Sequence, residues 1–308
     1  SSGTPMRFWV DRETQQSRES SLSWADHLAG WHYGERIAML WGSDKDIKSA
    51  SQELRSAFRW WVDNRRWYNA FNMGEARMDM FHKAMTRFKP HIMVAYAGSM
   101  EVYARYLNTQ RIRPTYPLRS IICSAEVLTL SARETIEQVF EKPVFNRYGN
   151  REFGAIAAEC KVHSGLHINE QDMLLEIESS EPKEIAGNVV ITYFNNLAMP
   201  FIRYNTGDMA RLHPSSTCSC GGETMRLAGI VGRESDTIRT RNGNLIHGEY
   251  FTHMLYSARN VREFQFVQVS LDEYRLLLVA DRKESAELEQ AMKYAMLERV
   301  GETSKVDI

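Results

Sequence analysis

Apolar positions in the middle of the chain follow two alternating periods. Short continuous apolar runs are typical of buried strands, and between them apolar residues recur three or four positions apart, as on one face of a helix. The expected elements are strands at residues 91–96, 120–123 and 143–148 and helices at residues 80–88, 100–107 and 131–140. Ser131 and Glu134 are expected to form a capping box at the start of the last helix. This order predicts a parallel sheet with right-handed crossovers.

The segments before and after this unit have other patterns. The N-terminal part predicts a helix over residues 23–31, followed by a short apolar segment over residues 37–41 that Gly42 closes. A long helix is expected after it, with apolar positions Ile47, Leu54, Phe58 and Trp61. After Cys160, short alternating strands predict an antiparallel subdomain at residues 166–168, 173–177, 189–193 and 200–204. Residues 204–208 are expected to form a turn closed by Gly207 and Asp208.

The C-terminal part predicts a small α+β unit. Its expected elements are a hairpin at residues 237–240 and 244–247 turned by Asn242-Gly243, strands at residues 263–269 and 274–280, and a helix at residues 285–300. The fold class is therefore α/β, with a large domain at residues 1–234 and a small domain at residues 235–308. Because residue 1 falls in a loop and the last residues read as a strand cut off mid-course, we expect the chain to be a fragment, incomplete at both ends.

Composition and charge describe an ordinary globular protein. Of the 308 residues, 43% are hydrophobic and 25% are charged, and the net charge is −1. This balance gives no basic field for nucleic acid or an anionic membrane. No apolar run approaches the roughly 18 residues of a membrane helix. Four cysteines in a chain of this length favour a reducing compartment, so we expect a cytoplasmic protein.

Arginine and tryptophan cluster at residues 59–61 and 65–67. This pattern is found where bases stack on aromatic rings and phosphates meet cations. Helical core aromatics with arginines that extend to solvent give the same pattern. The near-neutral net charge favours the second interpretation, and no nucleic-acid partner is expected.

Residues suited to a nucleotide follow the predicted parallel strands. Tyr148 offers a ring for a flat base, Gly149 allows close approach of backbone, Arg151 offers a cation for phosphate, and Glu152 offers a hard oxygen ligand for Mg²⁺. Gly98-Ser99 and residues 124–126 follow the other two strands. Because ligands of open α/β sheets bind at the carboxyl ends of strands, we expect all three segments at one edge. A solvated loop with an ordinary Arg–Glu pair is the alternative.

A second phosphate-binding segment is expected at the N-terminus. Ser1, Ser2, Gly3 and Thr4 are small residues whose backbone N–H groups can surround an anion, with Arg7 as a nearby cation. A polar terminus without fixed structure is the alternative.

The cysteines suggest a structural zinc site. Cys218 and Cys220 form a glycine-backed pair of thiols, and with Cys160 and either His163 or His167 they give a Cys₃His set. Free surface thiols are the alternative. Cys123 lies in an apolar strand and is expected to pack in the core.

The order of these segments resembles the adenylate-forming ligases, in the branch of the phenylacetate–CoA ligases and the CapK-type proteins of capsular polysaccharide gene clusters. The resemblance covers essentially the whole chain and is carried by five segments, at residues 1–5, 124–126, 148–152, 203–208 and 232–236. Residues 148–152 are similar to the family's Tyr-Gly-x-Thr-Glu motif, and residues 203–208 to its Tyr-Arg-Thr-Gly-Asp motif.

The resemblance implies a role for each segment. Ser1 to Thr4 would hold the β- and γ-phosphates of ATP, Thr4 acting in catalysis. Ser124, Ala125, Glu126 and Tyr148 would flank the adenine, and Gly149 would line the nucleotide site. Glu152 would coordinate Mg²⁺, Asp208 would bind the ribose hydroxyls, and Arg233 would contact the ribose or phosphate side. Among the histidines, the resemblance favours His167 as the zinc ligand.

The implied reaction joins a carboxylic acid to ATP as an acyl-adenylate and then to a thiol, that of coenzyme A. An acid pocket near Tyr96, Gly98, Ser99 and Met100 carries no charge, which favours an aromatic or otherwise apolar acid. Arg151 replaces the family's threonine and would clamp the α-phosphate. The family's distal catalytic lysine is expected beyond residue 308, so the fragment is expected to be inactive. Acyl transfer to an amine or hydroxyl in polysaccharide biosynthesis and non-catalytic nucleotide binding are the alternatives.

Overall fold

The computed structural model describes residues 6–42, 64–70, 73–179, 186–215, 217–233, 238–241, 245–246, 261–280, 285–301 and 304–308. The predicted phosphate loop, the predicted helix with Ile47 to Trp61, and Arg59 to Trp61 lie outside these residues. The chain forms two compact units. The first comprises Ser1–Glu176, Val190–Tyr204 and Arg211–Ile230, and the second comprises Ile177–Val189, Asn205–Ala210 and Val231–Ile308. The predicted domain boundary at residue 235 stays a prediction, because that residue is not among those described.

A large mixed sheet has the strand order β2-β1-β3-β4-β5-β6-β7-β11-β10-β9-β8. The parallel strands are β1 (Ile37–Leu40), β2 (Arg65–Tyr68), β3 (Ile92–Tyr96), β4 (Ser120–Ser124) and β5 (Val144–Asn150). From β5 onward through β6 (Gly154–Glu159) and β7 (Leu166–Ile168) to β11 (Arg226–Arg233) the pairing is antiparallel. The remaining strands are β8 (Met173–Glu178), β9 (Ala186–Tyr193) and β10 (Tyr204–Leu212). The predicted α/β fold class is confirmed.

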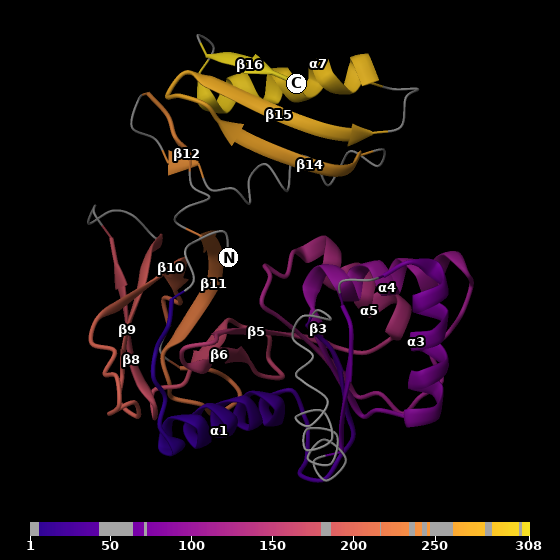
Figure 1. Ribbon diagram of the computed structural model, residues 1–308, viewed down its shortest axis with the longest axis vertical. Helices are drawn as coiled ribbons and strands as arrows, with labels where there is room; N and C mark the ends of the chain where they lie inside the picture. The colour runs from indigo at the N-terminus through magenta and orange to yellow at the C-terminus, as the bar shows by residue number, and fades with distance from the viewer. Residues whose placement is uncertain are drawn as a thin grey trace. The chain divides into compact units, whose positions relative to one another are not determined.

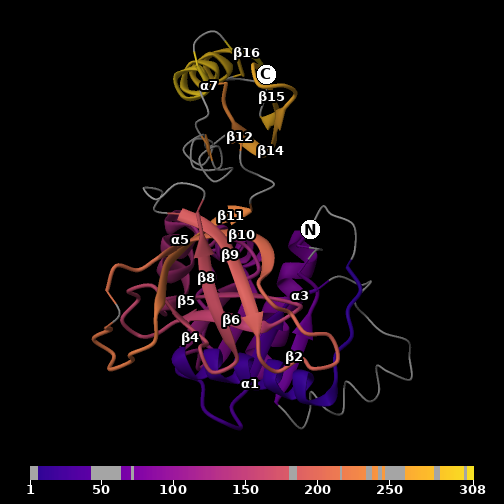
Figure 2. The same ribbon diagram turned by 90° about the vertical axis from the view of Figure 1, so that its left-hand side faces the viewer.

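Both faces of β1, β3, β4 and β5 are covered, which explains their continuous apolar runs. The interpretation of residues 65–67 as helical is wrong, because Arg65–Tyr68 form the partly buried edge strand β2. In β1, Ala38 and Leu40 pack in the core under α3 (Glu75–Phe88), α4 (Ala97–Thr109) and α5 (Leu130–Phe140), while Ile37 and Met39 pack on the opposite face. Figure 1 shows these three helices on one side of β3. Helix α1 (Arg12–Leu28) lies against β6, as Figures 1 and 2 both show.

Helix α1 begins at Arg12, well before the predicted start at residue 23. Its first turns were missed because their buried positions are Thr14 and Ser21, which give no apolar period. Asp11 caps the helix by accepting a hydrogen bond from the Thr14 N–H at 2.7 Å. In α5 the predicted capping box is wrong, because Thr129, two residues before Ser131, takes the N-cap position and accepts from the Ala132 N–H at 3.1 Å.

The predicted strand at residues 200–204 and turn at residues 204–208 are wrong, because β10 begins at Tyr204 and runs through both Gly207 and Asp208. The turn residues still make the local hydrogen bonds that their side chains favour. Asn205 Oδ1 accepts from the Gly207 N–H at 2.8 Å, and Thr206 Oγ1 accepts from the Asp208 N–H at 3.1 Å. Gly207 has φ +75°, which a side chain would disfavour.

The second unit contains a three-stranded sheet of β14 (Val261–Gln268), β15 (Glu273–Ala280) and β16 (Lys305–Asp307), with α7 (Ser285–Val300). Strands β12 (Ile238–Arg239) and β13 (Leu245–Ile246) form the predicted hairpin. The core of the sheet and α7 consists of Tyr274, Leu276, Met292, Met296, Val300 and Val306. Among the described residues no helix is both long and apolar enough to cross a bilayer.

Candidate functional site

Three neighbouring parallel strands bring the candidate segments together. Tyr96 at the end of β3 pairs with Ser124 at the end of β4, and Ser124 pairs with Arg147 of β5. The residues that follow, Gly98-Ser99, Ala125-Glu126 and the turn after Tyr148, therefore leave the sheet at one edge. This edge is where ligands bind in open α/β folds.

The Ser124 to Glu126 segment is fixed at both ends. Ser124 is buried, and its hydroxyl donates to the carbonyl of Arg147 at 2.8 Å. Ala125 is exposed and has φ +67°, in the left-handed region. Glu126 Oε2 accepts from the backbone N–H of Gly98 at 2.7 Å. The segment expected to flank a base therefore has its backbone held by two neighbouring strand ends.

The stretch from Tyr148 to Gly154 is a tight hairpin. We predicted that the strand ends at Tyr148, but β5 continues to Asn150 because its last residues pair with β6. The pairing shifts between Tyr148 and Gly149, and a Cβ on Gly149 would lie 2.3 Å from the carbonyl oxygen of Gly154. Asn150 Oδ1 accepts from the Phe153 N–H at 2.9 Å and closes the turn. Tyr148 itself is buried, 8% exposed.

Phe153 anchors this turn in the first unit. Its side chain is fully buried, and its ring lies 5.2 Å from Tyr193, 5.3 Å from Phe201 and 5.8 Å from Tyr204, measured between ring centroids. Such aromatic contacts add stability beyond the buried area. The two preceding residues remain at the surface, Arg151 exposed and Glu152 half-buried.

Arg18 of α1 is a cation near this turn that the sequence did not indicate. Burial lowers the pKa of its guanidinium, and the charge of Glu152 acts in the opposite direction. Its Nε atom is buried and has no hydrogen-bond partner in the described part of the chain. No sequence signal identified Arg18, because it stands in a polar run of α1.

A buried ion-pair network lies directly before Tyr148. Asp26 of α1 is fully buried and contacts Arg147 Nη1 at 3.1 Å and Arg65 Nη2 at 3.0 Å. Burial raises the pKa of Asp26, and the two guanidinium groups oppose that effect. The network ties β5 to α1 and was not predicted, because its members are far apart along the chain.

The expected acid pocket lies at the end of β3. The rings of Trp41 and Tyr96 stack with centroids 4.3 Å apart and planes inclined by 14°. Ser99 Oγ donates to the carbonyl of Ala70 at 3.1 Å, which ties the first turn of α4 to the chain beyond β2. Trp41 was missed as a candidate because it closes a strand that reads as core.

Asp208 and Arg233, expected at the ribose, belong to the second unit. Arg233 Nε lies 3.4 Å from Asp208 Oδ1. The aspartate side chain is 13% exposed and the arginine 47% exposed, so the carboxylate is the more deeply held partner. Ser1, Ser2, Gly3 and Thr4 lie outside the described residues.

Four of the predicted metal ligands come together. One ligand atom each from Cys160, His167, Cys218 and Cys220 lies within 4.8 Å of the others. Cys160 Sγ is 3.8 Å from Cys218 Sγ, and Cys220 Sγ is 3.5 Å from His167 Nε2. Tetrahedral zinc with its usual bond lengths places two sulfurs about 3.8 Å apart and a sulfur and a nitrogen about 3.5 Å apart. The donor set and its spacing fit zinc.

The neighbours of His167 hold its imidazole ring with one nitrogen directed toward Cys220. Thr224 Oγ1 lies 2.9 Å from its Nδ1, which leaves Nε2 facing Cys220. A Cβ on Gly222 would lie 2.9 Å from His167 Cε1, so only glycine fits there. Burial raises the pKa of Cys160 to about 11, and a bound cation is the usual means of holding such a thiol as thiolate.

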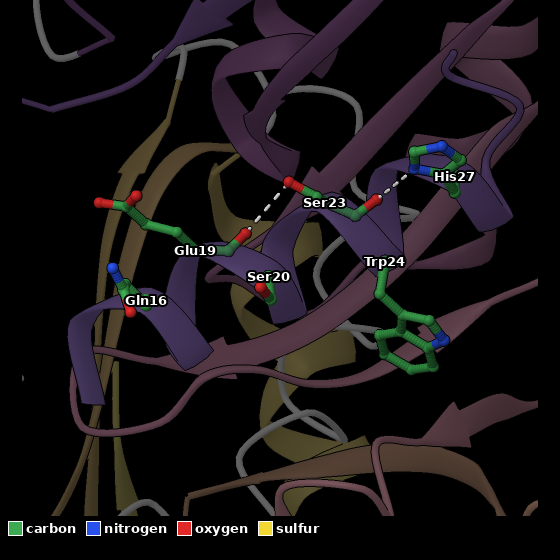
Figure 3. A pocket seen from close by; sticks show the side chains of 6 residues that line it. All are labelled: Gln16, Glu19, Ser20, Ser23, Trp24 and His27. Atoms are coloured by element: carbon green, nitrogen blue, oxygen red, sulfur yellow. Dashed lines mark hydrogen bonds between the residues drawn. The ribbon is translucent and has the colours of Figure 1, made fainter. Parts of the chain in front are cut away.

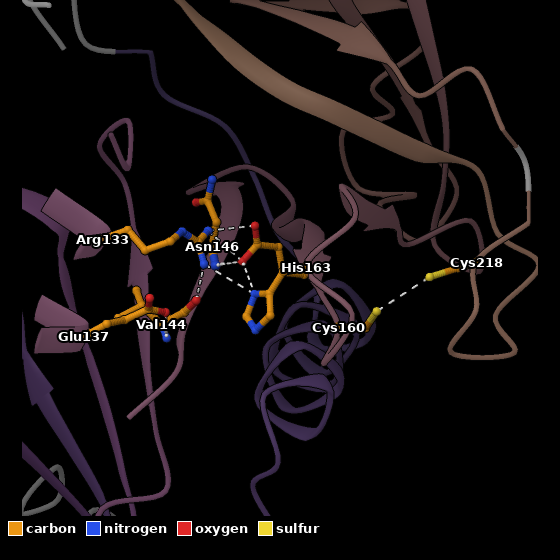
Figure 4. A network of polar contacts seen from close by, with 8 residues as sticks. Arg133, Glu137, Val144, Asn146, Cys160, His163 and Cys218 are labelled. Carbon is orange, nitrogen blue, oxygen red and sulfur yellow. Dashed lines mark hydrogen bonds and ion pairs between the residues drawn. The ribbon is translucent and has the colours of Figure 1, made fainter. Parts of the chain in front are cut away.

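The other candidate ligand, His163, has a different environment. Its Nδ1 lies 3.2 Å from Glu159 Oε2, within a network that also holds Arg133 and Asn146 (Figure 4). Arg133 Nη2 donates to both Glu159 oxygens at 2.8 and 2.9 Å, and the Asn146 N–H donates to Glu159 at 2.8 Å. This network joins α5, β5 and β6 immediately before Cys160.

A shallow hollow of about 610 Å³ lies on α1, lined by Gln16, Glu19, Ser20, Ser23, Trp24 and His27 (Figure 3). Ser23 Oγ donates to the Glu19 carbonyl at 3.1 Å, and His27 Nδ1 lies 2.8 Å from the Ser23 carbonyl. These polar groups are bound to the helix's own backbone. The hollow contains none of the predicted site residues.

No family model matches the chain. Protein CapK of Staphylococcus aureus is 23% identical over 307 residues, 98% of this chain and 67% of CapK. A phenylacetate–coenzyme A ligase of Thermus thermophilus is 26% identical over 201 residues, 61% of this chain and 45% of the ligase. Among solved structures, 2-hydroxyisobutyryl-CoA ligase in complex with 2-HIB-AMP has a TM-score of 0.73 at 16% identity, covering 100% of this chain and 69% of that one. The chain thus spans about two thirds of CapK and less than half of the Thermus ligase.

Proposed function

Because this chain belongs to the adenylate-forming ligase superfamily, in the branch of CapK and the phenylacetate–coenzyme A ligases, we propose that the protein activates a carboxylic acid with ATP and passes it to a thiol. The acid's oxygen attacks the α-phosphorus, pyrophosphate leaves, and an acyl-adenylate forms. The thiolate of coenzyme A then attacks the acyl carbon, and AMP leaves.

The observation that carries this proposal is the alignment of Tyr96, Ser124 and Arg147 across three neighbouring parallel strands. Because of this pairing, the segments that we propose to bind the acid, the adenine and the phosphates lie at the same edge of the sheet. Such a reaction asks little covalent chemistry of a protein, so alignment of two substrates and neutralisation of charge supply most of the rate.

Each nucleotide role is proposed from the chemistry of the side chain. Glu152 would hold Mg²⁺ against the phosphates, since a carboxylate oxygen is a preferred ligand of this ion. Arg151, exposed in the same turn, would neutralise the α-phosphate. Tyr148 would face the adenine. Asp208 would accept from the ribose hydroxyls, with Arg233 beside it.

The acid pocket is proposed between the first turn of α4 and the stacked rings of Trp41 and Tyr96. A flat apolar surface of this kind suits an aromatic acid, whose ring can pack parallel to it. Separately, we propose that Cys160, His167, Cys218 and Cys220 hold a structural Zn²⁺, since four protein ligands leave no open position for chemistry.

Exchange of labelled pyrophosphate into ATP tests the activation step. With the full-length protein and a panel of acids, we expect exchange that depends on both Mg²⁺ and an aromatic acid. ATP binding without exchange for any acid would favour a non-catalytic nucleotide-binding protein instead. An amine or a hydroxyl is the alternative acyl acceptor. Thioester formation with coenzyme A, measured on the same adenylate, distinguishes the two acceptors.

A further inference from the structure

Glu126 makes a contact that a role in binding adenine does not explain. Its carboxylate accepts the Gly98 N–H at 2.7 Å, across 28 residues of chain and between the ends of β3 and β4. The first turn of α4 depends on this contact, because its N-cap residue Tyr96 makes no side-chain capping hydrogen bond. Glu126 thus supplies from another loop the acceptor and the negative charge that favour a helix N-terminus.

The lack of a side chain at Gly98 leaves room for the Glu126 carboxylate. A Cβ at position 98 would lie 3.0 Å from Glu126 Oε2, a distance at which the carboxylate would have to move. The same turn is held from the other side by Ser99, whose hydroxyl donates to the carbonyl of Ala70 at 3.1 Å. The start of α4 is therefore fixed by two loops.

Ala125, between Ser124 and Glu126, has the left-handed φ of +67°. A non-glycine residue rarely adopts this conformation, and it persists where the surroundings over-determine it. Here Ser124 Oγ donates to Arg147 O at 2.8 Å on one side, and Glu126 binds Gly98 on the other. These two hydrogen bonds hold the segment to β5 on one side and to α4 on the other.

We infer that Glu126 is a positioning residue that couples the adenine-binding segment to the acid-binding turn. The inference rests on the proposed function. Without the carboxylate, Ala125 is free to relax and the first turn of α4 loses its cap, so the two binding segments no longer hold a fixed spacing. The binding of both the acid and ATP is then weakened by one change.

The test compares Glu126→Ala with Glu126→Gln and with Thr129→Ala, a matched loss of a helix cap on α5. Thr129 is buried and caps Ala132 at 3.1 Å, but it does not join the two segments. In pyrophosphate exchange, we expect Glu126→Ala to raise the KM of both acid and ATP about tenfold, as expected for one charge-assisted hydrogen bond. Glu126→Gln keeps a neutral acceptor and recovers most of both values.

Thr129→Ala is expected to lower the melting temperature as Glu126→Ala does. Both KM values should stay within about twofold of wild type, since the Thr129 cap does not join the two binding segments. Unchanged KM values in Glu126→Ala, or equal increases in the two alanine variants, would overturn the positioning role.

Amide hydrogen exchange gives a readout that needs no activity. We expect faster exchange at residues 97–101 and at residues 124–126 in Glu126→Ala, but not in Thr129→Ala. Unchanged exchange in either segment refutes the coupling, whatever reaction the protein catalyses. Faster exchange in both segments of a protein that shows no pyrophosphate exchange would uphold the coupling and reject the proposed function.

Discussion

Replacing Gly149 by alanine tests whether the hairpin after Tyr148 needs its close backbone approach. The new methyl carbon would lie 2.3 Å from the carbonyl oxygen of Gly154, whereas Cβ atoms in proteins stay beyond 3.0 Å from such atoms. The two strands must therefore separate locally by at least about 0.7 Å, the difference of these two distances. The obstacle is backbone, so no side-chain rotation relieves it.

This displacement has two expected consequences. Overpacking of this kind costs about 1–3 kcal/mol in the free energy of unfolding. Because the hairpin carries Arg151 and Glu152, a shift approaching 1 Å is also expected to lower kcat/KM for adenylation by up to about 100-fold. Chemical denaturation measures the first effect, and pyrophosphate exchange measures the second.

Gly229→Ala is the matched control. Gly229 lies in β11, and a Cβ there meets nothing within 4 Å. We expect this variant to stay within about 0.5 kcal/mol of wild type, as is usual for substitutions that disturb no contact. If Gly149→Ala matched Gly229→Ala in both stability and exchange activity, the argument from the 2.3 Å approach would be refuted.

Three further changes probe other parts of the molecule. Cys220→Ser is expected to lower both the zinc content and the melting temperature of the purified protein, whereas Cys123→Ser, outside the cluster, should keep the metal. Equal zinc content in the two variants would refute the proposed zinc site. Asp26→Asn leaves two guanidinium groups without their buried carboxylate, so we expect the free energy of unfolding measured in urea to fall by about 3–5 kcal/mol. A fall below about 1 kcal/mol would mean that water replaces the carboxylate. Glu152→Gln should keep the melting temperature and lower Mg²⁺-dependent pyrophosphate exchange about 100-fold. An unchanged rate with an unchanged Mg²⁺ dependence would count against a direct ligand.

The sequence was sufficient where local pattern and burial agree. Strands β3, β4 and β5 could be predicted because both of their faces are covered, which produces continuous apolar runs such as the one in β3. Strand β2 could not, because Arg65–Tyr68 lies at the edge of the sheet and contains no apolar run. The range of α7 was predicted to the residue, because its buried residues Met292, Met296 and Val300 recur four positions apart and Gly301 ends it with φ +111°. Residue types alone also named Cys160, Cys218 and Cys220 as a set.

Tertiary structure decided everything that depends on which distant residues meet. Residues 204–208 carry turn chemistry, yet they lie in a strand because neighbouring strands pair with them. Either His163 or His167 satisfied the spacing, and only the fold places His167 beside Cys220. Glu126 stood in a segment assigned to adenine, but its carboxylate binds α4. Local propensity acts over a few residues, whereas these contacts join positions 28 and 53 apart along the chain, so no local pattern can specify them.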